Sequence, residues 1–357
     1  GKLPLENGGI IDLTRNYFGL GSRLNYKIGK NYLQVAAELL DQSDQRDRYL
    51  NILGSQGSNS FSQKEKFQNF SFSILDELKL ETLFFRLSLR YDDMRLGTDS
   101  FSQDKIYQVI NPSLGVSYEL TPFHHIYVNF STSFETPTLS ELSANPSGAE
   151  GFNFELSPSE AISYELGWKG QWQRFKFETN LFLIESSNEI LPYELEEFPG
   201  RSFYRNTGAT QRYGLELAAQ YKYKEWEART SITQAKYLFK GSDNNSDNSL
   251  PGIPNSQIFL QLGYTTNNSL NFLITVEHIG ELYANNSNTV KVESFQNVRL
   301  QVGKSFNFNN IDLTFSGGIN NIFNERYFDN IRLNAFGKRY YEPAPTRNAY
   351  LGFQIEI

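Results

Sequence analysis

The sequence predicts an all-β protein, an antiparallel up-and-down transmembrane β-barrel. Three observations lead to this fold class. Apolar and polar residues alternate with a period of two, short and long connections alternate along the chain, and no apolar run reaches the roughly 18 residues of a transmembrane helix. The closing stretch RNAYLGFQIEI shows the first pattern, because alternate residues form one apolar face. These residues are Ala349, Leu351, Phe353, Ile355 and Ile357.

Period-two alternation recurs along the whole chain, in about 15 segments. In RFKFETNLFL, for example, Phe175, Phe177 and Leu181 oppose Lys176 and Asn180. The predicted strands cover residues 14–27, 31–50, 64–77, 81–93, 105–120, 123–134, 158–170, 173–187, 208–224, 226–240, 254–266, 269–279, 293–307, 309–325 and 345–357. No helix is predicted.

The connections between these strands alternate in length. Short turns fall near Gly29, Glu77, Pro122, Gly170, Lys224, Asn267 and Asn309. Longer polar connections cover roughly 51–63, 94–104, 135–157, 188–207, 241–253, 280–292 and 326–344. Outer-membrane barrels have short periplasmic turns and long external loops, so the long connections are predicted to be external.

A soluble β-sandwich is the alternative explanation of the alternation. Sandwich strands are typically about 5–6 residues long, and the predicted segments are longer. Their polar faces carry Lys, Glu, Asn and Gln together, as a watery lumen requires. A closed barrel also leaves no unpaired backbone groups in lipid, so the membrane barrel is favoured.

Composition excludes several classes of function among the 357 residues. The chain has no Cys, which rules out disulfides and thiolate metal sites. Its net charge of −7 argues against nucleic acid as a partner. Three His residues and one Met offer few bases or soft metal ligands. We therefore expect no catalytic residues, no resident metal and no cofactor.

Four stretches, in order along the chain, resemble the C-terminal part of TonB-dependent outer-membrane receptors. The first is NPSLGVSYELTPFHHIYVNFSTSFETPTLSEL, followed by EGFNFELSPSEAISYELGWKG and GRSFYRNTGATQRYGLELAAQYKY. The last combines GGINNIFNERYFDN with RYYEPAPTRNAYLGFQIEI and resembles the closing hairpin of the family. The resemblance covers roughly 105–357 well and 14–104 more loosely.

This resemblance implies a larger receptor, of which residues 1–357 are the C-terminal part of the β-barrel domain. Barrels of the family have about 22 strands, a plug domain and an energy-coupling TonB box. The resemblance therefore leads us to expect that further strands and a plug belong to the whole protein. The family often ends in an aromatic residue, whereas this chain ends in Ile357.

The resemblance also implies the location and partners of the protein. It is expected in the outer membrane of a Gram-negative bacterium, in contact with lipid and lipopolysaccharide. The TonB complex would energise transport through the plug. External loops would bind the transported ligand.

Candidate ligand-binding residues combine aromatic rings with basic groups in two predicted external loops. They are Arg201, Tyr204 and Arg205 in one loop, and Arg332, Lys338, Arg339 and Tyr340 in the other. Guanidinium groups pair with carboxylates or catecholates, and rings stack on a ligand, so the mixture suits an anionic metal chelate. The alternative role for each residue is loop packing and barrel closure.

The ligand class follows from what these loops lack. Copper and haem receptors favour Met and His ligands, which are scarce here. A ferric siderophore or similar iron chelate already satisfies its metal, so the sequence favours that class. Cobalamin, haem, copper or an oligosaccharide remain alternatives, as does a passive porin or structural barrel without a plug.

Overall fold

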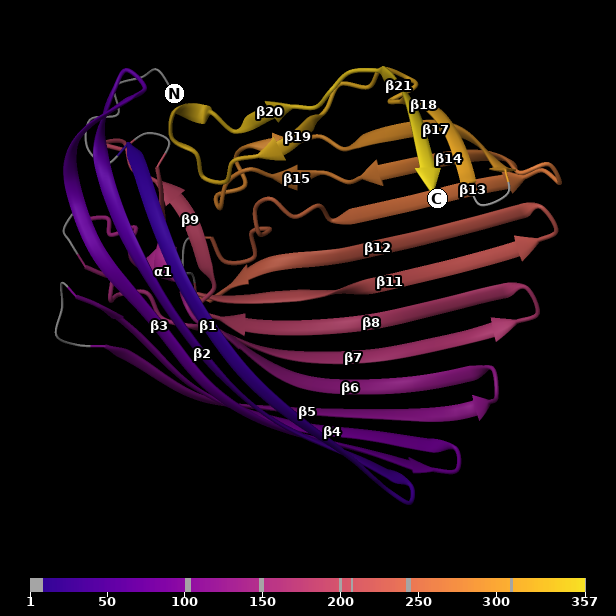
Figure 1. The fold of residues 1–357 in the computed structure, drawn as a ribbon, viewed down its shortest axis with the longest axis horizontal. Helices are drawn as coiled ribbons and strands as arrows, with labels where there is room; N and C mark the ends of the chain where they lie inside the picture. The colour runs from indigo at the N-terminus through magenta and orange to yellow at the C-terminus, as the bar shows by residue number, and fades with distance from the viewer. Residues whose placement is uncertain are drawn as a thin grey trace. The chain divides into compact units, whose positions relative to one another are not determined.

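The computed structural model describes residues 9–99, 104–147, 151–198, 201–206, 208–241, 245–308 and 311–356 (Figure 1). Most of these residues lie in β-strands. The two helices among them are α1 (Leu139–Leu142) and η1 (Phe336–Lys338). Within the described ranges, no helix is long and apolar enough to cross a membrane.

Fifteen long strands follow one another as antiparallel neighbours in chain order. They are β1 (Ile10–Ile28), β2 (Asn31–Ile52), β3 (Ser55–Leu80), β4 (Leu83–Thr98), β5 (Lys105–Thr121), β6 (His124–Glu135), β7 (Ser159–Trp172), β8 (Phe175–Ser187), β11 (Ala209–Tyr223), β12 (Trp226–Lys240), β13 (Ser256–Thr265), β14 (Leu270–Ile279), β17 (Phe295–Phe308), β18 (Ile311–Asn320) and β21 (Asn348–Glu356). Each predicted segment coincides with one of them, so the all-β, up-and-down prediction is confirmed.

Three predicted loops contain short hairpins that the sequence did not predict. They pair β9 (Ile190–Glu194) with β10 (Ser202–Asn206), β15 (Leu282–Tyr283) with β16 (Lys291–Val292), and β19 (Phe328–Ile331) with β20 (Tyr341–Pro343). The hairpins satisfy backbone groups within the loops themselves.

The prediction of a long loop over residues 51–63 is wrong. The chain turns within two residues, Leu53 and Gly54, and both have positive φ, as a tight hairpin turn requires. The Gly54 N–H donates to Asn51 Oδ1 (2.7 Å). The sequence obscured this hairpin because both faces of residues 55–66 are largely polar, so the apolar alternation fades although the strand continues.

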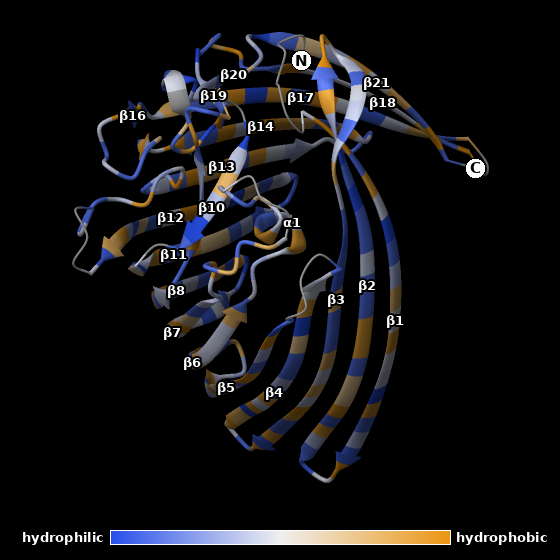
Figure 2. Ribbon diagram, turned by 90° about the vertical axis from the view of Figure 1, so that its left-hand side faces the viewer, coloured by the Kyte–Doolittle hydropathy of each residue, from blue (hydrophilic) through white to orange (hydrophobic). Residues whose placement is uncertain are grey.

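The last strand, β21, carries the predicted apolar face. Leu351, Phe353 and Ile355 are 93%, 57% and 52% exposed, which is the exposure expected of lipid-facing side chains. Phe353 pairs with Phe315 on β18, and their ring centroids are 4.8 Å apart. Figure 2 shows hydrophobic and hydrophilic residues alternating along the long strands.

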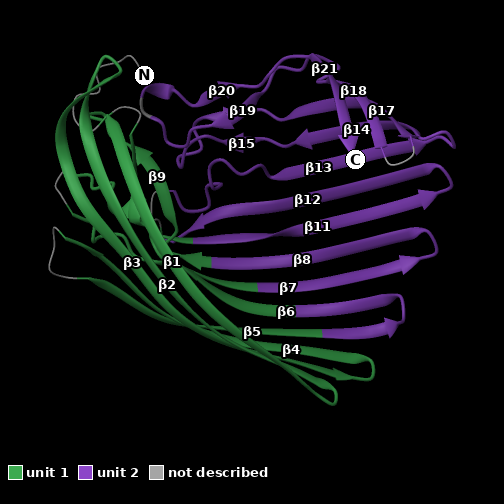
Figure 3. Cartoon of the chain, viewed as in Figure 1, with its two compact units in different colours: residues 1–116, 129–163, 186–209 green, residues 117–128, 164–185, 210–357 purple. Residues whose placement is uncertain are grey.

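The chain divides into two compact units (Figure 3). Unit 1 comprises residues 1–116, 129–163 and 186–209, and unit 2 comprises residues 117–128, 164–185 and 210–357. Each contains one apolar cluster beside its loops rather than a continuous core. The cluster in unit 1 surrounds α1, and the cluster in unit 2 surrounds Ala284 and Tyr340.

Strand lengths place the loops of unit 1 outside the membrane. A tilted transmembrane strand needs about 9–11 residues. β2 has 22 residues and β3 has 26, and a short turn joins Ile28 to Asn31 at the other end of β2. The distal parts of these strands, which include Arg46, Arg48 and Glu65, therefore lie beyond the lipid.

Candidate ligand-binding site

The connection after β6 begins with a capped helix. The Thr138 hydroxyl accepts a hydrogen bond from the Glu141 N–H (3.2 Å), and a Glu141 carboxylate oxygen accepts one from the Thr138 N–H (2.8 Å). This reciprocal capping box fixes the first turn of α1. The spacing Thr-x-x-Glu in TLSE is the sequence signal that could have predicted the helix.

The inner side of α1 is anchored by apolar contacts within unit 1. Leu139 and Leu142 are buried, and they cluster with Leu96 of β4 and with Phe152 and Leu156 from the following loop. A fully buried Leu side chain contributes about 1.5–3 kcal/mol through removal from water. The cluster therefore holds α1 against the strands.

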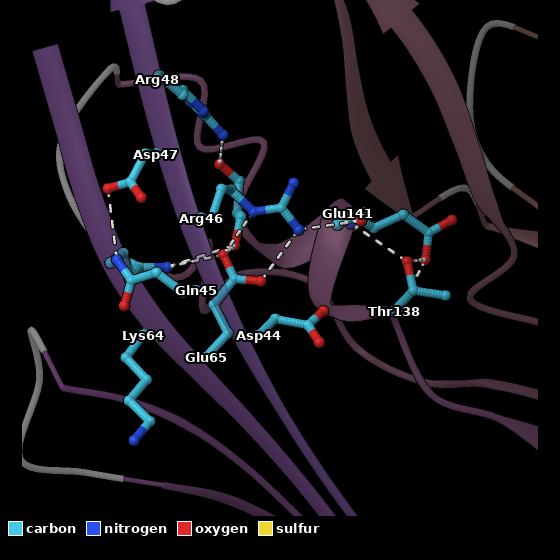
Figure 4. Close-up of polar contacts among 12 residues, drawn as sticks. Asp44, Gln45, Arg46, Asp47, Arg48, Lys64, Glu65, Thr138 and Glu141 are labelled. Carbon is cyan, nitrogen blue, oxygen red and sulfur yellow. Dashed lines mark hydrogen bonds and ion pairs between the residues drawn. The ribbon is translucent and has the colours of Figure 1, made fainter. Parts of the chain in front are cut away.

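A buried ion pair attaches the same segment to β2 and β3 (Figure 4). Arg46 donates from Nε and Nη2 to the two carboxylate oxygens of Glu65, at 2.7 and 3.0 Å. The Ser143 hydroxyl donates to Glu65, and Gln63 Nε2 also donates to it (3.2 Å). The Gly151 N–H donates to Gln63 Oε1 (2.7 Å). Glu65 is fully buried, and these donors compensate its negative charge.

A second buried carboxylate on the same face, that of Asp44, also has hydrogen-bond donors. Asp44 is fully buried and accepts from Arg15 Nε and Nη2 at 2.8 and 2.6 Å. The Gln42 amide donates to it as well, at 3.1 Å to Oδ2. The two buried carboxylates in this region thus have their own partners.

Arg48 is different, because no carboxylate among the described residues forms an ion pair with it. Its Nη2 donates to the Ser143 carbonyl (2.7 Å), and its guanidinium lies 4.6 Å from the centre of the Phe61 ring. Its Nε is buried without a hydrogen-bond partner in the described part of the chain. Burial, and then repulsion from Arg201 and Arg46, lower the pKa of Arg48 to about 10.

The structure places the first set of predicted site residues around the β9–β10 hairpin of unit 1. Arg201 is half-buried, with its guanidinium 4.8 Å from the Phe203 ring centre and 5.6 Å from that of Phe198. Burial lowers the pKa of Arg201. Arg205 is exposed and lies 5.1 Å from the Tyr193 ring centre.

Tyr204, the third member of this set, points elsewhere. It is half-buried against the apolar cluster of α1, where burial and then the nearby Glu141 raise the pKa of its hydroxyl. Its position fits the packing role better than direct ligand contact. Arg201 and Arg205 remain the stronger candidates.

The second set lies in unit 2, around the β19–β20 hairpin. Arg332 forms an exposed ion pair with Glu342 (2.8 Å). Tyr340 is buried in an apolar cluster with Ala284, Val292 and Ala335. Lys338 and Arg339 are exposed at the end of η1. Tyr340 is therefore a packing residue, whereas Lys338 and Arg339 are presented to solvent.

Asparagine side chains join three external loops of unit 2. The Asn334 amide donates to Asn286 Oδ1 (2.9 Å), and the Asn286 N–H donates to Asn334 Oδ1 (3.0 Å). Asn288 and Ser249 exchange a second pair of hydrogen bonds at 2.8 and 2.7 Å. The loops after β12, β14 and β18 are thereby fixed to one another without charged groups at these contacts.

Among the described residues of these loops, no side chains are grouped for metal ligation. Within the described ranges, no group of three or more His, Asp or Glu residues is arranged to hold a metal ion. The sites instead offer guanidinium groups beside aromatic rings. Such an arrangement can bind a planar or anionic molecule that carries its own metal.

The sequence analysis missed Arg46, Arg48 and Glu65. All three lie on the inward side of β2 and β3, within the predicted segments 31–50 and 64–77, and the sequence analysis assigned them no role. The charged run DQRDRY followed by QKEK was the available signal. It could not show which charges face the loop and which face outward.

Comparison with known proteins decides the family. The family model described as "TonB dependent receptor-like, beta-barrel" matches residues 5–322. The chain belongs to this family. Its barrels reside in the Gram-negative outer membrane, and its members are transporters rather than enzymes. The predicted family, fold class and localisation are therefore confirmed.

Two curated relatives transport or receive different ligands. The chain is 25% identical over 232 residues to the vitamin B12 transporter BtuB of Vibrio vulnificus, covering 64% of this chain and 35% of that protein. It is 26% identical over 152 residues to the ferric-pyoverdine 358 receptor of Pseudomonas putida, covering 40% of this chain and 18% of that one.

Solved structures agree on the fold. The ferric citrate transporter FecA in its unliganded form matches with a TM-score of 0.79 and 20% identity, covering 97% of this chain and 55% of that chain. The copper transporter OprC matches with a TM-score of 0.78 and 14% identity, over 97% and 56%. The chain thus spans about half the length of these structures, and about a third or less of the curated relatives.

Proposed function

We propose that this chain is the C-terminal part of the barrel domain of a receptor that imports a ferric siderophore or similar iron chelate. External loops bind the chelate, and the TonB complex supplies the energy for its passage through a plug domain of the whole protein. Lipid and lipopolysaccharide surround the outward face. The barrel performs no bond chemistry.

One observation carries the choice of ligand. The external segments present Arg201 and Arg205 against aromatic rings, while the described residues offer no cluster of metal-ligating side chains. A ligand that suits such a surface brings its own metal ligands and presents anionic oxygen atoms and rings. Ferric citrate and ferric catecholates have this chemistry.

Cobalamin is the second candidate, because the BtuB alignment covers more of the chain than the pyoverdine receptor alignment. Cobalamin is large and carries little negative charge, so it has less use for several loop guanidinium groups. Copper is less favoured, since the described loops lack the required ligand cluster. A passive porin is disfavoured by the family.

A deletion strain tests the proposal. Cells lacking the gene are grown under iron starvation on a panel of ferric chelates, and separately under conditions that require external cobalamin. We expect growth on at least one ferric chelate to be lost, and to return with the plasmid-borne gene. Unchanged growth on every chelate, with loss of cobalamin-dependent growth, would replace the iron proposal by the cobalamin one.

A further inference from the structure

A hollow lies on the last strands of unit 2, where β17, β18 and β21 are neighbours in the sheet (Figure 1). Its volume is about 1090 Å³, which is similar to that of ligand clefts. The residues that line it are mainly apolar, and they include Leu300, Val302, Phe315, Ile319, Leu351 and Phe353.

The pairing register shows which face of the sheet carries the hollow. Leu351 lies opposite Gly317, and Phe353 lies opposite Phe315. Phe315 in turn lies opposite Lys304 of β17. Directly opposed residues of antiparallel strands point to the same side of the sheet. Because Leu351 and Phe353 belong to the exposed apolar face, the hollow and Lys304 are on the lipid-facing side.

Small residues create the space. Gly317 has no side chain, and Ala349 beside it on β21 has only a methyl group; both line the hollow. A Cβ atom added to Gly317 would lie 3.0 Å from Leu351 Cδ2. A larger side chain at position 317 would therefore displace the tip of Leu351 and fill the hollow.

Lys304 is a charged residue on this apolar face. It is half-buried, and its Nζ lies 4.9 Å from the centre of the Phe306 ring. No carboxylate among the described residues forms an ion pair with it. The acidic residues of β17, β18 and β21 are Asp312 and Glu356, which pair with each other in register and face the opposite side. A lysine on a lipid-facing surface is costly unless its ammonium group reaches the interface or an anion.

The position of Lys304 along the strand places it near one membrane boundary. β17 ends at Phe308 beside a short connection, and short connections are predicted to be periplasmic. Aromatic rings gather at the same level: the ring centroids of Phe306 and Phe315 are 6.0 Å apart, and those of Phe315 and Phe353 are 4.8 Å apart. Such rings mark the level of the lipid headgroups. The Lys304 stem can therefore lie along the apolar surface while its ammonium group reaches a headgroup.

We infer that this hollow is a binding site for one anionic phospholipid of the periplasmic leaflet. An acyl chain lies over Gly317 between Phe315 and Leu351, and the lipid phosphate accepts hydrogen bonds from the Lys304 ammonium group. This inference does not depend on which ligand the receptor imports.

Charge complementarity favours a lipid over a second copy of the chain. A phospholipid joins an apolar chain to a phosphate, and the site joins an apolar hollow to an unpaired cation. In a symmetric dimer the same patch faces itself, so the two Lys304 side chains would be brought together without an anion. Like charges in such an interface are unfavourable.

The test uses the purified, delipidated full-length receptor in detergent. It is titrated with phosphatidylglycerol and with phosphatidylcholine of the same acyl chains, and bound lipid is counted by native mass spectrometry. Wild type is expected to retain one phosphatidylglycerol molecule, with roughly 10-fold tighter binding than phosphatidylcholine because of the charged contact.

Two kinds of variant separate the headgroup contact from the hollow. Lys304→Gln should lower the affinity for phosphatidylglycerol to that for phosphatidylcholine. Gly317→Leu and Ala349→Leu should instead weaken the binding of both lipids by roughly 10-fold, because each fills the hollow. Ala349 is exposed, so its variant provides the test if Gly317→Leu fails to fold.

Matched controls place the same substitutions on the polar face of unit 2. Lys176→Gln removes an exposed lysine of β8, and Gly263→Leu adds a side chain on β13, where a Cβ would lie 3.5 Å from Leu273 Cδ1. Both should bind the two lipids like wild type. Heat-dependent migration on a gel confirms that each variant is folded.

Three results would overturn the inference. Wild type could bind the two lipids equally, Lys304→Gln could keep the preference for phosphatidylglycerol, or both hollow-filling variants could bind lipid like wild type. A dimeric wild type that becomes monomeric in Gly317→Leu, with unchanged lipid binding, would assign this face to a second copy of the chain instead.

Discussion

The two units fix their external segments by different chemistry. In unit 1, buried charges do this, because Arg46, Glu65 and Gln63 hold the segment that contains α1. In unit 2, the amides of Asn286, Asn288 and Asn334 join three loops. A buried charge that loses its partner is costly, whereas a lost neutral amide costs less. Substitutions should therefore have larger effects in unit 1.

The two units also differ in the lengths of their strands. β2 and β3 of unit 1 extend well beyond the roughly 10 residues that span a membrane, whereas β13, β14 and β18 of unit 2 have 10 each. The long strands give the segment around α1 a rigid wall to pack against. The loops of unit 2 begin near the membrane boundary and stabilise one another instead.

The largest effect is expected for Glu65→Gln. The substitution leaves Arg46 buried without its counter-charge, which should cost about 3–5 kcal/mol. Hydrogen exchange of residues 138–147 measures the local opening. The matched control is Glu227→Gln in unit 2, which breaks a largely exposed pair with Arg229 and should cost less than about 1 kcal/mol. Equal effects in the two variants would contradict the contrast between the units.

The second-largest effect is expected for Leu142→Ala. Leu142 is fully buried under α1, and its truncation leaves a cavity that costs about 2–5 kcal/mol. Proteolysis of the α1 segment and hydrogen exchange report the loss. Leu351→Ala serves as control, because Leu351 is 93% exposed on the apolar face and its loss opens no cavity. If α1 stays protected in Leu142→Ala, the apolar cluster does not anchor the segment.

Asn334→Ala should have a smaller effect in unit 2. It leaves the Asn286 N–H without its acceptor, at a cost of about 1–3 kcal/mol. We expect faster hydrogen exchange in residues 280–292, with the same increment at low and high salt because no charge is involved. Asn271→Ala, at an exposed amide near a short turn, should change little. Strong salt dependence of the Asn334 effect would point to an ionic role instead.

The smallest effect concerns pH and the β19–β20 hairpin. Hydrogen bonds from Arg332 and then Asn330 lower the pKa of Glu342 below its ordinary value of 4.5. A lowered carboxyl pKa contributes stability above pH 4.5, and that stability is lost as the pH falls through the folded-state pKa. Hydrogen exchange of residues 328–343, corrected for intrinsic rates, should therefore accelerate in acid. Arg332→Gln should reduce this pH dependence; an unchanged profile would rule out the ion pair as its source.

Sequence alone could predict every long strand, because each carries an apolar face that must meet lipid. It could not predict where β3 begins, since residues 55–66 leave the lipid and their faces no longer differ in polarity. The hairpins within the loops were also missed, because short strands such as Ile190–Glu194 have too few residues to show a period.

The candidate site was predicted only in part. Basic and aromatic residues in the loops identified Arg201 and Arg205, which the structure places beside aromatic rings. Tyr204 and Tyr340 lie in the same basic and aromatic segments, but they pack into apolar clusters. The sequence did not single out Arg48, because its lack of a carboxylate partner depends on which arginines Glu65 and Asp44 already pair with, and only the structure shows that.

The most direct test of the account is ligand binding by the full-length receptor. Ferric citrate, a ferric catecholate and cyanocobalamin are titrated in parallel into wild type and into Arg201→Gln. We predict that a ferric chelate binds most tightly, with roughly 10-fold or greater weakening in the variant. Tight binding of cyanocobalamin alone, unaffected by Arg201→Gln, would contradict the assignment of these loops to an anionic iron chelate.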